Sequence, residues 1–440
     1  MMYRIVFILI LCSTTFTASA KYSGGIGEPN DPYQIATPAD LILLGETPED
    51  YDKHFILTAE IDLDPNLPGR KMFQRAVIAP DVQYQGLSFS GVFNGNGHSI
   101  KNLIITAGNV DYVGLFGKIE SEAIIHNVVL EKINIVGYEY VGGLVGNNQG
   151  SVQDCSTSGK VNGGHQVGGL IGLNEIHGNI SNCYNTGEVY GISLVGGLTG
   201  NNRNDGVISC CYNIGNVNAG SRSWAVGGLV GKNQKNGTII SSYSKSNVSG
   251  ATDTSGGLLG WNEFTGTVSS SYSNGTVKGG YTIGGLAGRN RGNLLDCYTE
   301  CDVTGYIEVG GFVGTNSSII INSYSTGSVV GGSTFGGFIG RGFGDEVFNS
   351  FWDIETSGRS ISDGGTPKTT AEMQTAVTFI DAGWDFLDET KNGFDDIWVI
   401  REGLDYPRLW WEKRSNGTRD PNDLYQIATA EYLILMGESP

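Results

Sequence analysis

A glycine-rich block recurs along the middle of the chain and limits its possible folds more than any other feature. A typical copy reads Val-Gly-Gly-Leu-Val-Gly, and the first reads Val-Gly-Leu-Phe-Gly. The copies follow one another at intervals of 26 to 31 residues. Nine copies end at Gly117, Gly146, Gly172, Gly200, Gly231, Gly260, Gly288, Gly314 and Gly340. A repeat of this length predicts that each unit forms one layer of an elongated, repetitive fold.

Two further elements accompany the block. An asparagine stands two residues after the last glycine in seven copies, at Asn148, Asn174, Asn202, Asn233, Asn262, Asn290 and Asn316. About ten residues later comes Cys or Ser, usually followed by Tyr, and then a Gly-x-Val-x-Gly stretch such as 187–191. Each unit therefore holds three short strand-like segments and no sustained 3.6-residue period. This pattern predicts one coil of a parallel β-helix for each unit.

The β-helix makes specific demands on the repeated residues. Equivalent residues of successive coils stack about 4.8 Å apart, so nine coils form a rod section of about 43 Å. We expect glycine to permit positive φ and close backbone approach at the corners. We expect each asparagine to bond nearby backbone or its own copy in the next coil. A β-propeller is disfavoured because its blades need about 40 or more residues.

These repeats resemble the GLUG motif family, named for a Gly-Leu-x-Gly core such as 143–146, over roughly residues 110 to 345. The flanks resemble the lead-in and closing segments of pectin-lyase-like right-handed β-helices. They are 31–37, 59–63 and 93–100 upstream, and 350–353, 368–374 and 405–411 downstream. The resemblance implies an all-β, right-handed parallel β-helix of secreted bacterial type, without catalytic residues. GLUG repeats also occur beside immunoglobulin-A-cleaving zinc peptidases, whose His-Glu-x-x-His motif is absent from this sequence.

The N-terminus has the three parts of a secretory signal peptide. Arg4 supplies the positive charge, 5–11 is the apolar run, and 18–20 is an Ala-Ser-Ala cleavage site before Lys21. The apolar run is too short to cross a bilayer. We therefore predict that residues 1–20 are removed, that the mature chain has no transmembrane segment, and that it is secreted or lies at the cell surface.

The remaining chain divides by its patterns. We predict an N-terminal cap with the first coils over 21–95, the GLUG-repeat β-helix over 96–350, and a C-terminal cap over 351–412. The C-terminal cap contains a helix candidate at 370–377, with Thr370 as N-cap. The final segment, 413–440, is predicted to be the truncated start of a second module. Within it, 420–440 matches 28–48 at 14 of 21 positions.

Charge and motif content exclude several classes of function. The formal net charge is −18, which repels nucleic acid. The five histidines form no zinc motif, and neither a Gly-x-Ser-x-Gly elbow nor a phosphate-binding loop is present. We therefore predict a chain that is not an enzyme and has no cofactor. The alternative is a polysaccharide lyase or hydrolase of the β-helix type that uses acidic residues. Its candidate carboxylates are Asp154, Glu188, Asp296 and Asp302, which do not recur in successive coils.

Two segments have oxygen ligands at spacings that partly match calcium loops. They are 62–66 with Gly69, and 388–399, in which Val399 stands where a calcium loop has glutamate. We expect both to be turns, with structural calcium as the alternative.

The cysteines fit the repeat. Cys155, Cys183 and Cys211 share one repeat position, where other coils have serine. This exchange favours packed thiols over a disulfide ladder. The pairing state of Cys210, Cys297 and Cys301 stays open, with Cys297 and Cys301 as a local candidate pair.

Variable stretches between the repeats are the candidate binding surface, because a solenoid keeps its core constant and varies its loops. They are equivalent in successive coils and should line one edge of the rod. Aromatic residues at variable positions are predicted to contact ligand: Trp224, Trp261, Tyr281 and Tyr306. We hypothesise adhesion to, or recognition of, glycans or surface proteins. The alternative is a structural spacer that displays other domains.

Overall fold

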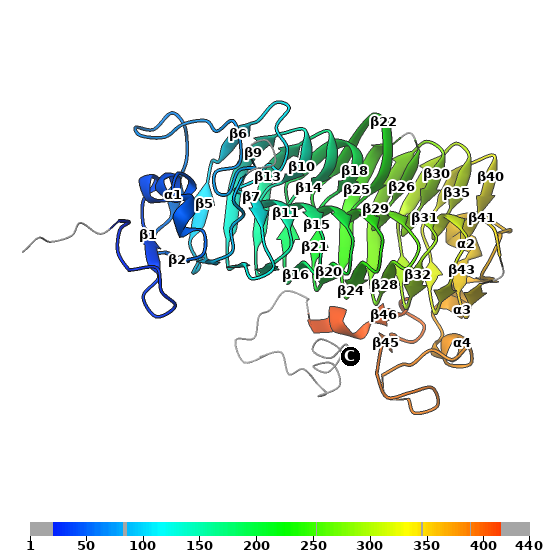
Figure 1. Ribbon diagram of the computed structural model, residues 1–440. Coiled ribbons are helices and arrows are strands. Elements are labelled where there is room, and N and C mark those ends of the chain that lie inside the picture. The colour runs from blue at the N-terminus through cyan, green and yellow to red at the C-terminus, as the bar shows by residue number, and fades with distance from the viewer. Residues whose placement is uncertain (1–20, 82–85, 252, 345, 388, 415–440) are drawn as a thin grey trace, which may run out of the picture.

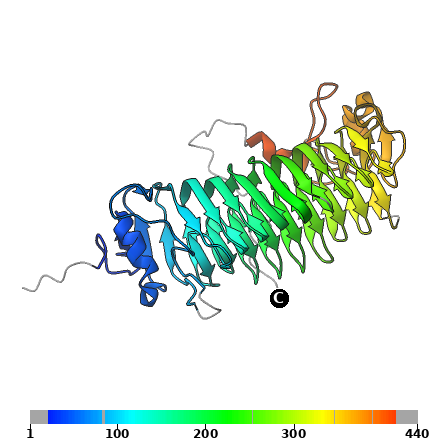
Figure 2. The same ribbon diagram turned by 90° about the horizontal axis from the view of Figure 1, so that it is seen from above.

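The computed structural model describes residues 21–81, 86–251, 253–344, 346–387 and 389–414. Within these residues, strands of successive coils pair in parallel and wind around one elongated core (Figure 1). The molecule is a right-handed parallel β-helix, which confirms the predicted fold class. The view from above shows the coils stacked as a rod, with the C-terminal segment lying along one side (Figure 2).

Three parallel sheets run the length of the described rod. Sheet I comprises β1 (Tyr33–Ile35), β2 (His54–Leu57), β4 (Val92–Asn94), β8 (Ile124–His126), β12 (Ser151–Gln153), β16 (Asn179–Ser181), β20 (Val207–Ser209), β24 (Thr238–Ile240), β28 (Thr267–Ser269), β32 (Asn293–Leu295), β37 (Ile320–Ile321) and β42 (Val347–Phe348). Sheet II comprises β7 (Phe116–Ile119), β11 (Val145–Asn148), β15 (Ile171–Asn174), β19 (Thr199–Asn202), β23 (Val230–Asn233), β27 (Leu259–Asn262), β31 (Ala287–Asn290), β36 (Val313–Asn316) and β41 (Ile339–Gly342).

Sheet III contributes two or three strands to most coils. It comprises β3 (Ile61–Asp62), β5 (Ser99–Lys101), β6 (Ile104–Thr106), β9 (Val129–Val136), β10 (Glu139–Gly142), β13 (Ser156–Asn162), β14 (His165–Gly168), β17 (Tyr184–Asn185), β18 (Glu188–Gly196), β21 (Tyr212–Asn213), β22 (Val217–Gly227), β25 (Tyr243–Ala251), β26 (Thr254–Gly256), β29 (Tyr272–Gly279), β30 (Thr282–Gly284), β33 (Tyr298–Thr299), β34 (Asp302–Gly305), β35 (Glu308–Gly310), β38 (Tyr324–Ser325), β39 (Val329–Gly331), β40 (Thr334–Gly336), β43 (Phe351–Asp353) and β44 (Thr366–Lys368).

Short helices and one hairpin-like pair complete the described residues. The helices are α1 (Pro38–Gly45), α2 (Ile354–Ser357), α3 (Thr370–Met373) and α4 (Ala376–Ile380), with 3₁₀ turns η1 (Pro48–Asp50) and η2 (Trp410–Arg414). An antiparallel pair joins β45 (Trp398–Val399) to β46 (Arg408–Leu409). None of these helices is long and apolar enough to cross a membrane.

The repeated asparagines form a buried ladder between coils, as predicted. The Asn148 Nδ2 donates to Asn174 Oδ1 at 2.6 Å, and Asn174 Nδ2 donates to Asn202 Oδ1 at 2.7 Å. The same contact continues through Asn233, Asn262, Asn290 and Asn316. Each buried amide thus finds partners in the next coil, which fixes the register of the stack.

The block glycines serve close packing, whereas the expected positive φ is found at glycines of the following stretch, such as Gly275 and Gly331. A Cβ added at Gly142 would lie 2.2 Å from the Val145 carbonyl oxygen, so only glycine fits. Positive φ also occurs just before the Cys or Ser position, at residues such as Asp154 and Asn182. Asparagine and aspartate tolerate this left-handed conformation better than most residues.

The cysteine slot is buried and unoxidised. All six cysteines of the described residues are free thiols. The Cys155 backbone N–H donates to Cys183 Sγ at 3.3 Å, and the Cys183 N–H donates to Cys211 Sγ at 3.4 Å. In the next coil the Cys211 N–H donates to Ser242 Oγ at 3.1 Å. Serine and cysteine thus accept the same bond, and burial raises the pKa of the Cys155 and Cys183 thiols.

Caps close both ends of the rod. At the N-terminal end, α1 begins with a capping box between Thr37 and Asp40. At the other end, the predicted helix at 370–377 is two short helices, α3 and α4, and the prediction of Thr370 as N-cap is wrong by one residue. Thr369 is the N-cap because its hydroxyl accepts from the Glu372 N–H, whereas Thr370 donates to Asp353. The predicted signal peptide, and 415–440 of the predicted second module, lie outside the described residues.

Candidate functional site

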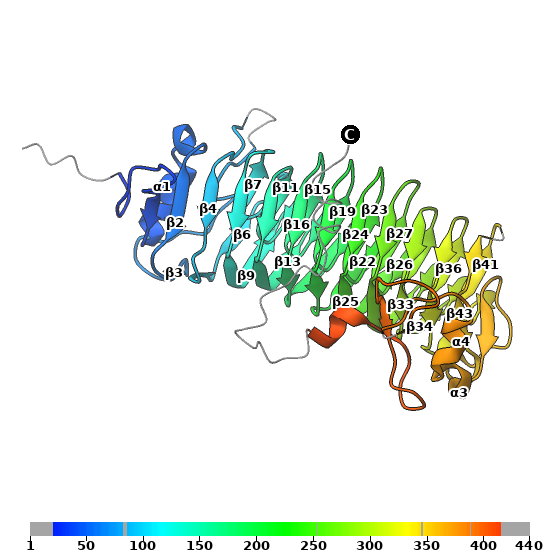
Figure 3. The same ribbon diagram turned by 90° about the horizontal axis from the view of Figure 1, so that it is seen from below.

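Sheet II carries a row of equivalent residues immediately before the asparagine ladder. The labels of its strands follow one side of the rod in Figure 3. From β7 to β41 the row reads Lys118, Asn147, Leu173, Asn201, Lys232, Trp261, Arg289, Thr315 and Arg341. It contains four cations and no carboxylate, although the chain as a whole has a net charge of −18. Lys118, Lys232 and Arg341 pair with carboxylates outside the row, whereas Arg289 has no ion pair in the described residues.

Two predicted ligand-binding residues meet over this row. The rings of Trp224, on β22, and Trp261, on β27, lie 6.0 Å apart in an edge-to-face arrangement. Lys232 Nζ lies 4.6 Å from the centre of the Trp261 ring and 5.9 Å from that of Trp224. Cations placed over indole faces are attracted by the negative face of the ring. The pair is thus one aromatic surface with a positive edge.

Two arginines extend this surface toward the C-terminal end of the rod. Arg289 Cζ lies 5.2 Å from the centre of the Trp261 ring, and Arg291 Cζ lies 5.7 Å from the same ring. Arg291 also lies 5.5 Å from the ring of Phe264, which is exposed. The Trp261 Nε1–H is buried and has no acceptor among the described residues. We call Trp224, Lys232, Trp261, Arg289 and Arg291 the cation–aromatic cluster.

The carboxylates nearest the cluster are already engaged. Glu263 Oε2 lies 2.6 Å from Lys232 Nζ. Glu308 binds Arg341 Nη1 at 3.0 Å and accepts from Thr315 Oγ1 at 2.6 Å. Partial burial alone would raise the pKa of Glu308, but these hydrogen bonds hold it below its ordinary value. Neither Arg289 nor Arg291 has a carboxylate within ion-pair distance in the described part of the chain.

A cavity of about 250 Å³ lies beside the two arginines. It is lined by Arg289, Arg291, Glu308, Thr315, Ser317 and Phe343. The cavity therefore combines two guanidinium groups, two hydroxyls and one exposed aromatic ring with a single carboxylate on its wall. Such a mixture of polar donors and a ring suits a polar ligand with an apolar face.

The other two predicted residues lie apart from the cluster. Tyr281 follows β29 and Tyr306 follows β34, and their side chains are 56% and 78% exposed. Among the described residues, no ring contact joins either tyrosine to Trp224 or Trp261. Backbone hydrogen bonds do place the variable stretches side by side in successive coils: the Ile192 N–H donates to the Gly164 oxygen, and the Asp253 N–H to the Ser223 oxygen. They therefore line one edge, as the repeat predicts.

Sequence reasoning missed the three cations Lys232, Arg289 and Arg291. A signal was present, because Lys232 and Arg289 stand directly before a ladder asparagine, and Arg291 directly after one. Writing the repeats in register would have placed Lys232, Trp261 and Arg289 in one row.

A larger cavity, of about 660 Å³, lies near the N-terminal end of sheet II. Its lining includes 71–75, Asp81, Asp111 and Tyr112. Asp111 Oδ1 is buried without a hydrogen-bond partner in the described residues, and burial, with help from Glu139, raises the pKa of Asp111. Residues 82–85 beside it lie outside the described residues, so the cation–aromatic cluster is the better defined site.

Three of the four candidate acidic residues of an enzyme have polar partners of their own. Glu188 lies 3.4 Å from Lys160 Nζ. Asp302 accepts from Ser328 Oγ at 2.6 Å, and Asp296 accepts from Asn322 at 3.1 Å. Burial raises the pKa of Asp296. Asp154 lies five coils from Asp302, so these carboxylates form no common site.

The first of the two calcium-like segments folds as a hydrogen-bonded turn. Asp62 Oδ1 accepts from the Asp64 N–H at 2.9 Å and from Asn102 Nδ2 at 2.8 Å. In the described residues, no group of three His, Cys, Asp or Glu side chains has a metal-binding arrangement. The second segment, 388–399, includes Asp388, which lies outside them.

A second aromatic surface is closed by the chain itself. Tyr184, Tyr212, Tyr243, Tyr272, Tyr298 and Tyr324 stack in successive coils with ring centres 4.8 to 5.1 Å apart. The segment 398–412, which we call the strap, crosses the C-terminal part of this ladder (Figure 3). Trp411 of the strap lies 5.8 Å from the ring of Tyr272.

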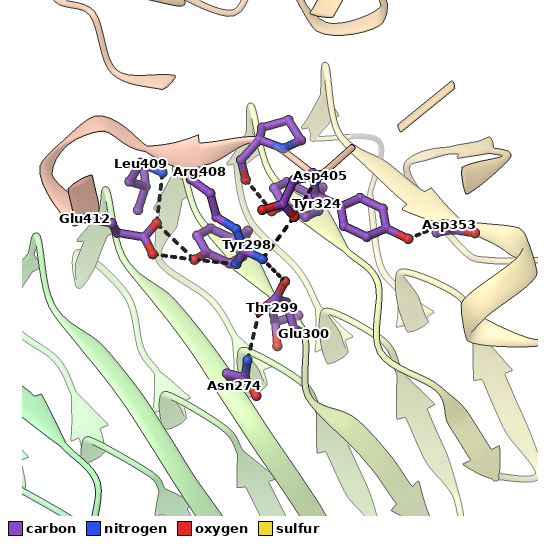
Figure 4. Close-up of polar contacts among 12 residues, drawn as sticks. Asn274, Tyr298, Thr299, Glu300, Tyr324, Asp353, Asp405, Arg408, Leu409 and Glu412 are labelled. Atoms are coloured by element: carbon purple, nitrogen blue, oxygen red, sulfur yellow. Dashed lines mark hydrogen bonds and ion pairs between the residues drawn. The ribbon is translucent and has the colours of Figure 1, made fainter. Parts of the chain in front are cut away.

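Figure 4 shows the polar contacts that hold the strap in place. Arg408 Nη2 lies 2.6 Å from Glu300 Oε1, and the Tyr298 hydroxyl donates to Glu412 Oε2 at 2.8 Å. The Tyr324 hydroxyl donates to the Pro407 carbonyl. Burial raises the pKa of Tyr298 and of Glu412. Each charged group here has a partner, so this surface is part of the fold.

Comparison with known proteins identifies the repeats. The model of the GLUG motif matches residues 137–162, 163–190 and 222–249. Halomucin of Haloquadratum walsbyi is 32% identical over 163 residues, which are 36% of this chain and 2% of halomucin. A proposed Gly-rich membrane protein of Evansella cellulosilytica is 34% identical over a match 198 residues long, gaps included, that covers 36% of this chain and 21% of that protein. The chain thus spans only a small part of either relative.

Two solved structures match this chain at low identity and low TM-score. One is a proposed immunoglobulin A1 protease from Bacteroides ovatus, with 17% identity over 89% of this chain and 96% of that chain and a TM-score of 0.44. The other, an IgA1 protease, has 16% identity over 76% of this chain and 24% of that chain, with a TM-score of 0.41. The sequence repeats, the family match and the parallel coils agree: the chain is a β-solenoid that carries GLUG-motif repeats.

Proposed function

We propose that this chain is a non-enzymatic recognition rod of the cell exterior that binds carbohydrate at the cation–aromatic cluster. The observation that carries the proposal is the Trp224–Trp261 pair, flanked by Lys232, Arg289 and Arg291. Indole faces stack on the apolar faces of sugar rings, while the surrounding cations donate hydrogen bonds to sugar oxygens. Trp224 is 36% exposed, so its ring is available at the surface.

The location rests on further support. The sequence begins with the pattern of a secretory signal. One relative is named a halomucin and the other a Gly-rich membrane protein, and both names fit a protein of the cell exterior or surface. An acidic, elongated rod is also suited to holding a binding site away from the cell surface. Carbohydrate is favoured over a protein partner because the cluster is small, cationic and aromatic.

A glycan array followed by titration calorimetry tests the proposal with the purified protein. We expect wild-type protein to bind a subset of glycans, and Trp224→Ala or Trp261→Ala to weaken binding about tenfold or more, which is about 1.4 kcal/mol. The matched control is Tyr190→Ala, since Tyr190 is 45% exposed on β18 and has no place in the cluster. Circular dichroism of each variant checks that the β-helix is intact.

Three outcomes would contradict the proposal. A wild-type protein that binds no glycan in a broad panel supports the spacer alternative. Glycan recovered in cleaved form after incubation supports the alternative of a polysaccharide-cleaving enzyme. Equal losses of binding in Tyr190→Ala and Trp261→Ala would move the binding site away from the cluster.

A further inference from the structure

We infer that Arg289 and Arg291 form a subsite for a singly charged anionic substituent, carboxylate or sulfate, on the bound sugar. This inference rests on the proposed function and names the ligand class of the same site. Its basis is that both guanidinium groups lack a carboxylate partner in the described residues, on a chain whose net charge is −18. A positive pair left open on an acidic protein is available to an external anion.

Both arginines flank one asparagine of the ladder and lie near the same indole ring. Arg289 lies within β31, Asn290 belongs to the buried ladder, and Arg291 begins the bend that follows the strand. Both guanidinium carbons lie within 6 Å of the centre of the Trp261 ring, at 5.2 and 5.7 Å. The indole therefore holds the two cations beside each other without neutralising them.

Neighbouring carboxylates do not fill the role of the anion. Glu263 is adjacent to Arg291 in register but is bound to Lys232 at 2.6 Å. Glu308 lines the cavity but is held by Arg341 at 3.0 Å and by two threonine hydroxyls, Thr315 at 2.6 Å and Thr282 at 3.2 Å. Because these partners fix both carboxylates, the guanidinium groups keep free donors toward the cavity.

The cavity selects the kind of anion. Guanidinium groups bind the paired oxygens of carboxylate or sulfate through parallel hydrogen bonds. Glu308 on the cavity wall repels a second negative charge, which disfavours a doubly charged phosphate. Thr315 and Ser317 add hydroxyls, and the exposed ring of Phe343 can contact the sugar itself. The volume of about 250 Å³ fits one sugar ring with a small polar substituent, not a whole glycan chain.

The adjoining tryptophans set the direction of the ligand. Lys232, Trp261 and Arg289 are register neighbours in three successive coils. Successive coils are about 4.8 Å apart. A linear glycan that stacks on the exposed ring of Trp224 and contacts the edge of Trp261 would therefore run along the rod and bring the next unit to the arginine pair.

The test compares matched oligosaccharides of about six units in titration calorimetry. The probes are a uronic acid oligomer, its methyl ester, the uncharged hexose oligomer and the O-sulfated hexose oligomer. We expect wild-type protein to bind the uronate or the sulfated oligomer about tenfold more tightly than its uncharged counterpart. Whichever charged oligomer binds more tightly than its uncharged counterpart identifies the anion as carboxylate or as sulfate. The preference should shrink between about 50 mM and about 200 mM salt, because the Arg–anion contact is screened.

The double variant Arg289→Gln with Arg291→Gln should bind charged and uncharged oligomers equally, because the preference for the charged oligomer is lost. Its control is Lys160→Gln with Lys278→Gln, which removes the same charge from sheet III. Charged and uncharged oligomers that bind wild type equally would overturn the inference and leave the proposed function standing. Loss of the preference in the lysine control would also overturn it. Absence of all binding would overturn both.

Discussion

The strap and the cation–aromatic cluster both place arginine over an aromatic ring, but in opposite surroundings. In the strap, Arg408 lies 5.3 Å from the ring of Tyr298 and forms ion pairs with Glu300 at 2.6 Å and Asp405 at 3.3 Å. In the cation–aromatic cluster, Arg289 and Arg291 lie 5.2 and 5.7 Å from Trp261 without a carboxylate partner in the described residues. Both regions place arginine over a ring, but only the strap has carboxylates that pair with the arginine.

That difference separates structural from ligand-binding roles. A guanidinium group enclosed with carboxylates stabilises the fold, and removing it leaves buried charge without compensation. A guanidinium group without a partner contributes little to stability, and its free donors can bind an external anion. Three changes test whether the two regions differ in this way.

The largest effect is expected from Arg408→Ala. Glu300 and Glu412 would lose their cation while remaining largely buried, so we expect a loss of about 2 kcal/mol in the free energy of unfolding, discounted because Arg408 is partly exposed. Urea denaturation followed by circular dichroism measures it. Arg289→Ala is the matched control and should cost less than about 0.5 kcal/mol. Equal losses would remove the distinction between the regions.

A smaller effect is expected when a carboxylate is introduced beside the arginine pair of the cation–aromatic cluster. Ser317 is the register neighbour of Arg291 in the next coil, so Ser317→Glu places a carboxylate where the anion is proposed to bind. We expect binding of charged oligosaccharide to weaken about tenfold, and stability to rise by about 0.5 kcal/mol. Ser317→Gln is the control, because glutamine has the size of glutamate but no charge. Unchanged binding in Ser317→Glu would place the anion elsewhere.

The smallest effect concerns pH, and its sign differs between the regions. The folded-state pKa of Glu412 is raised, mainly by burial, so its contribution to stability falls as pH rises from the ordinary pKa of glutamate to the raised value. The folded-state pKa of Glu308 is lowered, so its contribution is present above the ordinary pKa and is lost as pH falls through the lowered value.

Unfolding free energies measured between about pH 3 and about pH 7 test both signs. Relative to wild type, Glu412→Gln should gain stability as pH rises, and Glu308→Gln should gain stability as pH falls. If the stability of both variants, relative to wild type, changed in the same direction with pH, the direction of the pKa shift given for Glu412 or for Glu308 would be wrong.

Much of the rod was predictable because each coil repeats the same types of residue at equivalent positions. The ladder from Asn148 to Asn316, and the exchange of Cys211 for Ser242, follow directly from residues at equal spacing. The proximity of Trp224 and Trp261 was only half predictable. Sequence reasoning placed both residues off the ladders at variable positions, but only Trp224 in a stretch of the variable edge, so their ring contact came from the structure.

The strap was beyond sequence reasoning for a physical reason. Tyr298 and Glu412 are 114 residues apart, and Ser270 and Trp411 are 141 apart, so no periodic pattern links them. The capping box of α1, by contrast, is local and visible in the sequence as Thr37 followed three residues later by Asp40, although no helix was predicted there. The open arginine pair also needed the structure, since sequence does not show which carboxylates are engaged elsewhere.

The strap changes how the rod can come apart. In a stack where each coil touches only its neighbours, fraying starts at an end and proceeds coil by coil. The strap breaks this one-dimensional rule, because Trp411 contacts Tyr243 and Tyr272 while Tyr406 reaches Tyr324 and Asp353. Coils that are several steps apart are thereby joined, so the last of them cannot peel away singly. The C-terminal end of the rod must open as a cooperative unit, with the strap detaching first.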